Sequence, residues 1–212
     1  MKNIAMTCLL AAGLAACGSK PVQPDWTSNA SGSLKSFSQS YLKGETVAAE
    51  SEFKRARNEM ASTGRPDLVA HAELYRCATR VAALEYDDCP GFLALEQDAT
   101  LSERAYAAYL AGRWQGLEAA LLPEQHRGIV HGKGGVAAIA DPLSQLVAAG
   151  VLMRAGRIAP ADIKLATETA SGQGWRRPLL MWLGVAHRRA QDAGDAAEAA
   201  RIQRRIDLAL LR

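Results

Sequence analysis

The sequence is poor in β-branched residues and has no convincing run in which apolar and polar residues alternate. Because such alternation is the usual mark of a half-buried strand, its absence argues against a fold built on β-sheets. Ala, Leu, Arg and Glu, which are good helix formers, are abundant instead. The composition therefore predicts an all-α protein.

The chain also lacks a strong charge of one sign, since its formal net charge is +3 over 212 residues. Proteins that bind nucleic acids in general carry a pronounced basic surplus, so we expect no nucleic-acid partner. Beyond residue 16 no uncharged apolar run approaches the roughly 20 residues that a membrane-spanning helix needs. We therefore expect no later segment to cross a membrane.

The first residues have the pattern of an export signal. Lys2 supplies a positive charge, and residues 4–16 form an apolar run without a charged side chain. This run is too short to span a bilayer, and it ends in the small residues Ala15 and Ala16. A positive start, a short apolar run and small residues before a cleavage point are typical of a signal peptide over residues 1–16.

The stretch Leu14-Ala15-Ala16-Cys17 resembles the lipobox of bacterial lipoproteins. The resemblance implies cleavage before Cys17 and attachment of lipid to that residue. In that family an Asp after the Cys retains the protein at the inner membrane, whereas Gly18 stands here. The resemblance therefore implies a lipid anchor in the outer membrane with the body facing the periplasm. An ordinary secretory signal with a chance Cys is the alternative.

The segment after the anchor differs in composition from the rest of the chain. Residues 17–33 are rich in Ser, Gly, Pro and Asn, and Trp26 is their one large hydrophobe. This composition is typical of a flexible tether. We therefore expect a lipidated tether over residues 17–33 and one helical domain over residues 34–212.

Cysteine is scarce, with four residues in the whole chain. Cys8 leaves with the signal peptide and Cys17 is assigned to lipid, which leaves Cys77 and Cys89. Because two remaining thiols in an oxidising compartment usually pair, we expect a disulfide between them. Two free, buried thiols are the alternative.

Helix start and stop residues recur along the body. Proline is favoured at the first position of a helix, and glycine is favoured just after the last one. Asp141 precedes one such proline as a plausible N-cap. Between these marks the apolar residues fall at helical spacing, which predicts about nine or ten helices in antiparallel hairpins. The expected starts are Pro66, Pro142, Pro160 and Pro178, and the expected stops are Gly44, Gly64, Gly112, Gly156, Gly172 and Gly194.

The stretch YLKGETVAAESEFKRA, residues 41–56, resembles the centre of a tetratricopeptide repeat. The family's packing positions are matched by five residues, Tyr41, Gly44, Ala49, Phe53 and Ala56. Weaker copies follow, and their turn glycines lie 68, 44 and 38 residues apart, of which only the first gap is a multiple of the family's period of about 34 residues. The resemblance therefore implies an irregular tetratricopeptide-like stack of hairpins, and a generic irregular helical bundle is the alternative.

Enzyme motifs are incomplete wherever they begin. Two S-x-x-K stretches, at residues 40–43 and 51–54, lack the S-D-N and K-T-G elements of penicillin-recognising enzymes. The stretch HRGIVHGKGG, residues 126–135, lacks the spacing of a phosphate-binding loop, and we expect it to be a flexible connection. His126 and His131 are five residues apart, which does not favour a metal pair on one helix face. We expect no catalytic residue, metal, cofactor or small-molecule substrate.

The C-terminal region differs from the rest in charge. Residues 175–212 hold eight arginines against four acidic residues, a surplus of four positive charges. This region is either a surface for an acidic partner or an ordinary solvated helix face. Together these features predict a non-catalytic scaffold that binds another protein of the cell envelope. An enzyme, or an accessory subunit of an enzyme, acting on cell-wall material is the alternative.

Overall fold

The computed structural model describes residues 24–211, and in this part of the chain all regular structure is helical. Ten α-helices are joined by short connections, three of which contain a single 3₁₀ turn. The predicted all-α stack of about nine or ten helices is confirmed. The α-helices are α1 (Asp25–Lys43), α2 (Thr46–Ala61), α3 (Pro66–Ala82), α4 (Pro90–Leu93), α5 (Leu101–Leu110), α6 (Glu124–His131), α7 (Pro142–Arg154), α8 (Pro160–Gly172), α9 (Arg176–Asp192) and α10 (Ala196–Leu210), and the 3₁₀ turns are η1 (Glu96–Asp98), η2 (Ala119–Leu121) and η3 (Val136–Ala138).

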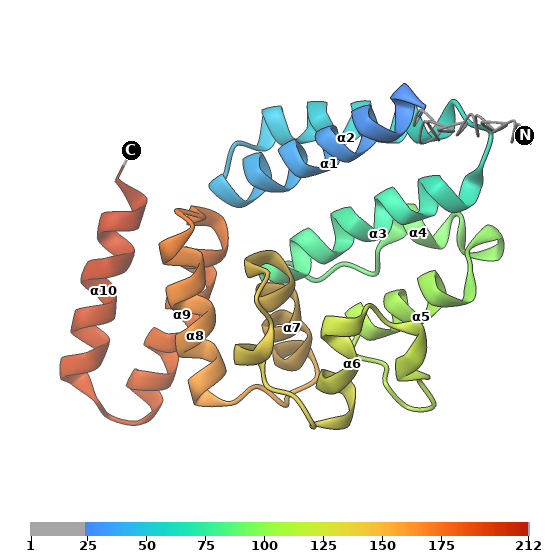
Figure 1. Cartoon of the computed structure of the whole chain (residues 1–212). Coiled ribbons are helices and arrows are strands. Elements are labelled where there is room, and N and C mark those ends of the chain that lie inside the picture. The colour runs from blue at the N-terminus through green and yellow to red at the C-terminus, as the bar shows by residue number, and fades with distance from the viewer. Residues whose placement is uncertain (1–23, 212) are drawn as a thin grey trace, which may run out of the picture.

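The helices form a curved stack (Figure 1). The α1–α2 hairpin lies across the top of the view, α3 lies beneath it, and α5, α6 and α7 follow below α3. The pair α8 and α9 comes next, and α10 ends the row on the side opposite the start of α1. A continuous core runs from Ala30 in α1 to Trp182 in α9, while α10 packs through a small separate cluster against α9.

The first hairpin shows why its sequence folds locally. Gly44 adopts φ +90°, a left-handed conformation that suits glycine, and it ends α1 so that α2 can turn back. Phe37 in α1 and Phe53 in α2 are both buried, with ring centroids 5.3 Å apart. Ala49 and Ala56, both fully buried, are the small residues of α2 on this face. The hairpin is therefore held by two aromatic rings and by alanines that leave room between helices.

A close crossing of α3 and α7 forms the centre of the stack. Gly150 in α7 lies so close to the backbone carbonyl of Val81 in α3 that a Cβ atom at position 150 would overlap the carbonyl. The Tyr86 hydroxyl, from the α3–α4 connection, donates to the Gly150 carbonyl at 2.9 Å. Glycine at this position lets the two helices approach closely, and this crossing fixes the relative placement of their exposed faces.

The helix starts follow the sequence signals at most places. Pro66, Pro142 and Pro160 each begin a helix. Asp141 caps α7, because its Oδ1 accepts a hydrogen bond from the Ser144 amide at 2.7 Å. Pro178 lies two residues inside α9, which begins at Arg176.

Two expectations about loops are wrong. Helix α1 begins at Asp25, so residues 25–33 of the expected tether are helical, and Ala30 and Ser33 are buried. Asp25 in the first turn complements the helix dipole, and burial of Ala30 and Leu34 against the core outweighs the weak helix propensity of a Ser- and Asn-rich stretch. Residues 1–23, which hold the rest of the expected signal and tether, lie outside the described residues.

The second correction concerns residues 126–135. Residues 126–131 belong to α6 and are not a flexible connection. Gly132 ends the helix in the left-handed conformation at φ +64°, and the following chain folds back so that Gly134 packs against Gly128. His126 and Ile129 anchor the helix because both side chains are buried.

Candidate functional site

Two adjoining cavities lie along the exposed side of α3. The first, about 670 Å³, is enclosed by α3, α5, the η2–α6 segment and α7, and the second, also about 670 Å³, lies between α1, α3 and the start of α7. Both are lined by His71, Tyr75, Asp141 and Leu143, so they form one continuous depression, which we call the α3 groove. Each cavity falls within the 300–1,000 Å³ typical of ligand sites.

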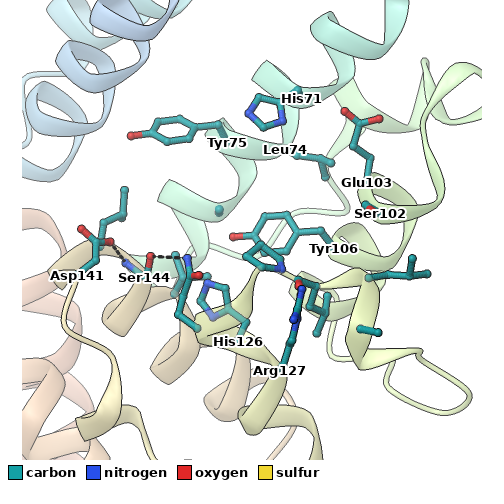
Figure 2. Close-up of a pocket in the computed structure, with 18 residues that line it drawn as sticks. His71, Leu74, Tyr75, Ser102, Glu103, Tyr106, His126, Arg127, Asp141 and Ser144 are labelled. Carbon is teal, nitrogen blue, oxygen red and sulfur yellow. Dashed lines mark hydrogen bonds between the residues drawn. The ribbon is translucent and has the colours of Figure 1, made fainter.

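The first cavity has an aromatic wall (Figure 2). The Tyr106 ring lies 5.9 Å from the rings of both Tyr109 and His126, measured between centroids. Behind it the Tyr109 hydroxyl and His126 Nδ1 are hydrogen-bonded at 3.1 Å. These rings come from α5 and α6, and their contact holds the wall of the cavity in place.

His126 is uncharged at neutral pH. Its side chain is buried, and burial lowers the pKa of the imidazole to about 4, although the Asp141 carboxylate opposes part of this shift. Desolvation disfavours the imidazolium, which is the charged form. The cavity wall therefore offers a neutral imidazole.

The Tyr106 hydroxyl faces the cavity with no hydrogen-bond partner among the described residues, and no dashed line reaches it in Figure 2. Burial raises the pKa of this phenol, so it stays protonated at neutral pH. Tyr75, also on the wall, differs because its hydroxyl donates to Ser38 Oγ at 3.0 Å. Tyr106 therefore offers a hydrogen-bonding group that a ligand could satisfy.

Both acidic groups of the groove already hold helix N-termini. Glu103 Oε2 accepts from the Thr100 amide at 2.8 Å and completes a capping box on α5. Asp141 caps α7 through the Ser144 amide. Arg127 in the first cavity and Lys35 in the second add two positive charges, so the groove has no surplus of either sign.

The second cavity is lined largely by hydrophobic side chains from several helices. Trp26 belongs to the first turn of α1, and Trp175 precedes α9, so the two indoles border the cavity from distant parts of the chain. Leu34, Met60 and Leu68 add aliphatic surface. A depression with this much apolar surface, and with polar groups mixed in, suits hydrophobic side chains better than a strongly charged ligand.

The residues predicted for repeat packing lie outside the groove. Tyr41, Ala49, Phe53 and Ala56 are buried within the first hairpin, and Gly44 forms its turn. None of the five lines either cavity. They position α1 and α2, and so hold one edge of the second cavity without contacting its interior.

The structure pairs Cys77 with Cys89 in a disulfide whose Cα atoms are 5.6 Å apart. Cys77 is buried in α3, and Cys89 precedes α4 with φ +50°, so the bond ties the α3–α4 connection to α3. The Asp87 carboxylate lies within 4.8 Å of both sulfur atoms. Disulfide sulfurs are not thiolates, and this trio therefore lacks two of the ligands that a metal would need. Cys17, the expected lipidation site, lies outside the described residues.

Helical spacing carries a partial signal for the groove residues that were not predicted. His71 and Tyr75 are four residues apart on α3, and Ser102 and Tyr106 are four residues apart on α5. Such spacing places each pair on one helix face, but only the fold turns the two faces toward each other.

Comparison with protein families, curated proteins and solved structures finds no match to this chain. Among the described helices, none is both long and apolar enough to span a bilayer.

Proposed function

We propose that this protein is an outer-membrane lipoprotein, anchored through Cys17, that binds a segment of another envelope protein in the α3 groove. The α3 groove carries the proposal, because it is a long, largely apolar depression with scattered polar groups between stacked helices. Stacked helical hairpins commonly present such surfaces to extended polypeptides. The partner's apolar side chains would fill the two cavities, and its backbone would meet Tyr106 and the polar edge.

The chemistry of the groove favours binding over catalysis. A glycosidase acting on cell-wall polysaccharide needs a pair of carboxyl groups that are free to exchange protons or to attack the sugar. Glu103 and Asp141 instead accept hydrogen bonds from backbone amides at the starts of α5 and α7. These carboxylates are used to cap helices, which supports a role as a binding scaffold rather than the alternative of an envelope enzyme.

The role of the α3 groove is tested by affinity purification of the full chain from membranes of the cells that make the protein. His71 is exposed where the two cavities meet, so His71→Trp would fill the junction without disturbing the core. His131→Trp is the matched control, because His131 is equally an exposed helical histidine but lines neither cavity. A stoichiometric partner that is lost only with His71→Trp would support the proposal. A partner retained by both variants would place the binding surface elsewhere.

The anchor is tested separately with Cys17→Ser. This variant should appear in soluble fractions or stay unprocessed, because several acyl chains are needed for firm attachment and the variant has none. Membrane attachment and a mature N-terminal mass that both match the unmodified protein would rule out lipidation at Cys17. Turnover of cell-wall material by the purified protein would instead support the enzyme alternative.

A further inference from the structure

A second depression lies on the other part of the stack, along α9. It has a volume of about 600 Å³ and is bounded by the end of α7, the start of α8 and the exposed side of α9. Ile163 is buried at its base, while Met181 keeps 43% of its surface exposed. We call this depression the α9 groove, and its apolar lining consists of Met153, Ile158, Ile163, Leu180, Met181 and Val185.

Gly184 lies in the α9 groove and in the middle of a helix. Glycine weakens a helix interior relative to alanine, so an interior glycine calls for a reason. For Gly150 and Gly128 the reason is close packing, because each lies against backbone from another segment. A Cβ atom at Gly184 would meet nothing within 4 Å in the described structure. The bare backbone at Gly184 therefore gives an incoming segment room to approach α9 closely.

The border of the α9 groove is basic. Arg188 and Arg189 line it, and no acidic residue of the part of the chain that the structure describes does so. The Arg188 side chain is 77% exposed, and within residues 24–211 its only ion pair is with Asp192 of the same helix, at 3.8 Å. Arg189 makes no ion pair with any described residue. An acidic partner would complement these charges.

Charge also argues against a second copy of this chain as the occupant. A twofold contact through α9 would pair the same patch of both copies, and the described lining of that patch holds no acidic residue to complement Arg188 and Arg189 of the other copy. A self-contact would therefore bury four arginines without opposite charges, which is unfavourable. A bilayer surface would satisfy the arginines through its anionic headgroups, but it gives no reason for a bare backbone at Gly184. A partner helix accounts for both features.

We propose that the α9 groove binds an acidic amphipathic helix of another envelope protein. Its apolar face lies on Met181 and Val185, its backbone crosses α9 at Gly184, and its acidic residues face Arg188 and Arg189. This is the helix-in-groove mode of recognition, in which apolar anchors recur every three or four residues. The α9 groove shares no lining residue with the α3 groove, so this surface is additional to the one in the proposed function.

Photo-crosslinking in the cells that make the protein tests the proposal on the full chain. Benzoylphenylalanine at position 181 should capture one polypeptide segment, and mass spectrometry of the cross-linked peptide should show helical apolar spacing and a net negative charge. Gly184→Leu and the double change Arg188→Glu with Arg189→Glu should each reduce the cross-link at least tenfold. Gly32→Leu is the matched control, because Gly32 is also an open glycine inside a helix but lies on a polar surface of α1.

Gly184→Ala separates an effect on binding from an effect on folding. Alanine favours the helix and meets no neighbour, so this variant should raise the midpoint of thermal unfolding and still weaken the cross-link. A synthetic peptide of the captured segment should bind the purified protein more weakly when its Asp and Glu are changed to Asn and Gln. A cross-link to lipid, to a second copy or to a segment without acidic residues would overturn the proposal. The absence of a cross-link, or a cross-link whose yield none of these variants changes, would also overturn the proposal. Neither result would affect the test of partner binding in the α3 groove, because that test uses other residues.

Discussion

Arg177 in α9 donates a hydrogen bond from Nε to the backbone carbonyl of Tyr41 in α1, at 2.8 Å and across 136 residues of sequence. Its Nη1 lies 3.2 Å from Glu85 Oε1, and its Cζ lies 4.2 Å from the centroid of the Tyr41 ring. The Tyr41 hydroxyl donates to Glu85 Oε2 at 2.6 Å. One arginine thus joins the first hairpin, the α3–α4 connection and α9, and it closes the curved stack on this side.

Arg177→Ala should lower the free energy of unfolding by about 2–3 kcal/mol, since a hydrogen bond to a charged group contributes roughly 1.5–3 kcal/mol. Arg177→Lys should recover only part of this loss, because an ammonium group cannot reproduce the planar fork of the guanidinium. Urea unfolding measures both changes. Arg204→Ala is the control and should stay within about 0.5 kcal/mol, because Arg204 is exposed on α10. Equal urea midpoints of unfolding for Arg177→Ala and Arg204→Ala would contradict the role of Arg177 in holding the first hairpin, the α3–α4 connection and α9 together.

The first hairpin gives a second prediction. Phe53 is 4% exposed, packs on Phe37 and lies under the Arg76 guanidinium, whose Cζ is 4.7 Å from the ring centroid. Phe53→Ala should therefore cost about 3–5 kcal/mol, the usual range for truncating a buried Phe. Ala49→Leu should cost about 1–3 kcal/mol by overpacking. Lys54→Ala, on the exposed side of the same helix, should change stability by less than about 0.5 kcal/mol, and a Phe53→Ala effect that small would contradict the packing.

Sequence reasoning worked where the cause of a structure is local. Pro142 with Asp141 before it marks the start of α7, and Gly44 marks the turn of the first hairpin, because capping and left-handed backbone depend on a few adjacent residues. The apolar series that holds Phe37 on one helix, and the series that holds Phe53 on the next, likewise follow helical periodicity. These signals are sufficient to predict an all-helical stack.

Sequence reasoning failed where the cause lies elsewhere in the chain. The Ser-rich start of α1 is helical because Ala30 and Leu34 are buried in the core by other helices, α2 above all, which composition does not reveal. The α3 groove depends on Tyr75 and Tyr106 facing the same space, and the α3–α7 crossing at Gly150 sets the position of one of its walls. These relations are tertiary, so periodicity along one helix could not predict them.

Two glycines inside helices should respond to alanine with opposite signs. Gly150→Ala should destabilise the protein by about 1–3 kcal/mol or more, because the new methyl group would overlap the Val81 carbonyl. Gly32→Ala should stabilise it by up to about 1 kcal/mol, because no atom of the described residues lies within 4 Å of the new Cβ and alanine favours the helix. Thermal unfolding compares the two. A gain in stability for Gly150→Ala would mean that α3 and α7 are further apart than described.

The disulfide prediction concerns thiols and stability together. Cys77 and Cys89 are 12 residues apart, and closing a loop of this size stabilises a fold by about 3 kcal/mol in the chain-entropy account. The denatured, unreduced mature protein should therefore show no free thiol from these two residues, and reduction should lower the free energy of unfolding by about that amount. Thiol counting and urea unfolding with and without dithiothreitol provide the measurements. Two free thiols per chain before reduction would contradict the pairing.

The pH dependence of stability should carry a contribution from His126. Burial holds its pKa at about 4 in the folded chain, against an ordinary value of 6.5, so the unfolded chain binds a proton in this range while the folded chain does not. The contribution of His126 to stability is therefore fully present above pH 6.5 and is lost as the pH falls toward 4. Each unit of pKa difference corresponds to about 1.4 kcal/mol, so the loss should approach about 3 kcal/mol at pH 4.

His126→Phe isolates this contribution from the carboxylates that also titrate below pH 6. The variant loses the hydrogen bond with Tyr109, which lowers its stability by an amount that does not depend on pH in this range. The free energy of unfolding of the protein minus that of the variant should therefore fall steadily, by about 3 kcal/mol in all, from pH 6.5 to pH 4. The matched control is His131→Phe, because His131 is an exposed histidine on the same helix. A difference between protein and His126→Phe variant that stays constant with pH would place His126 in contact with water and would remove the neutral imidazole from the wall of the α3 groove.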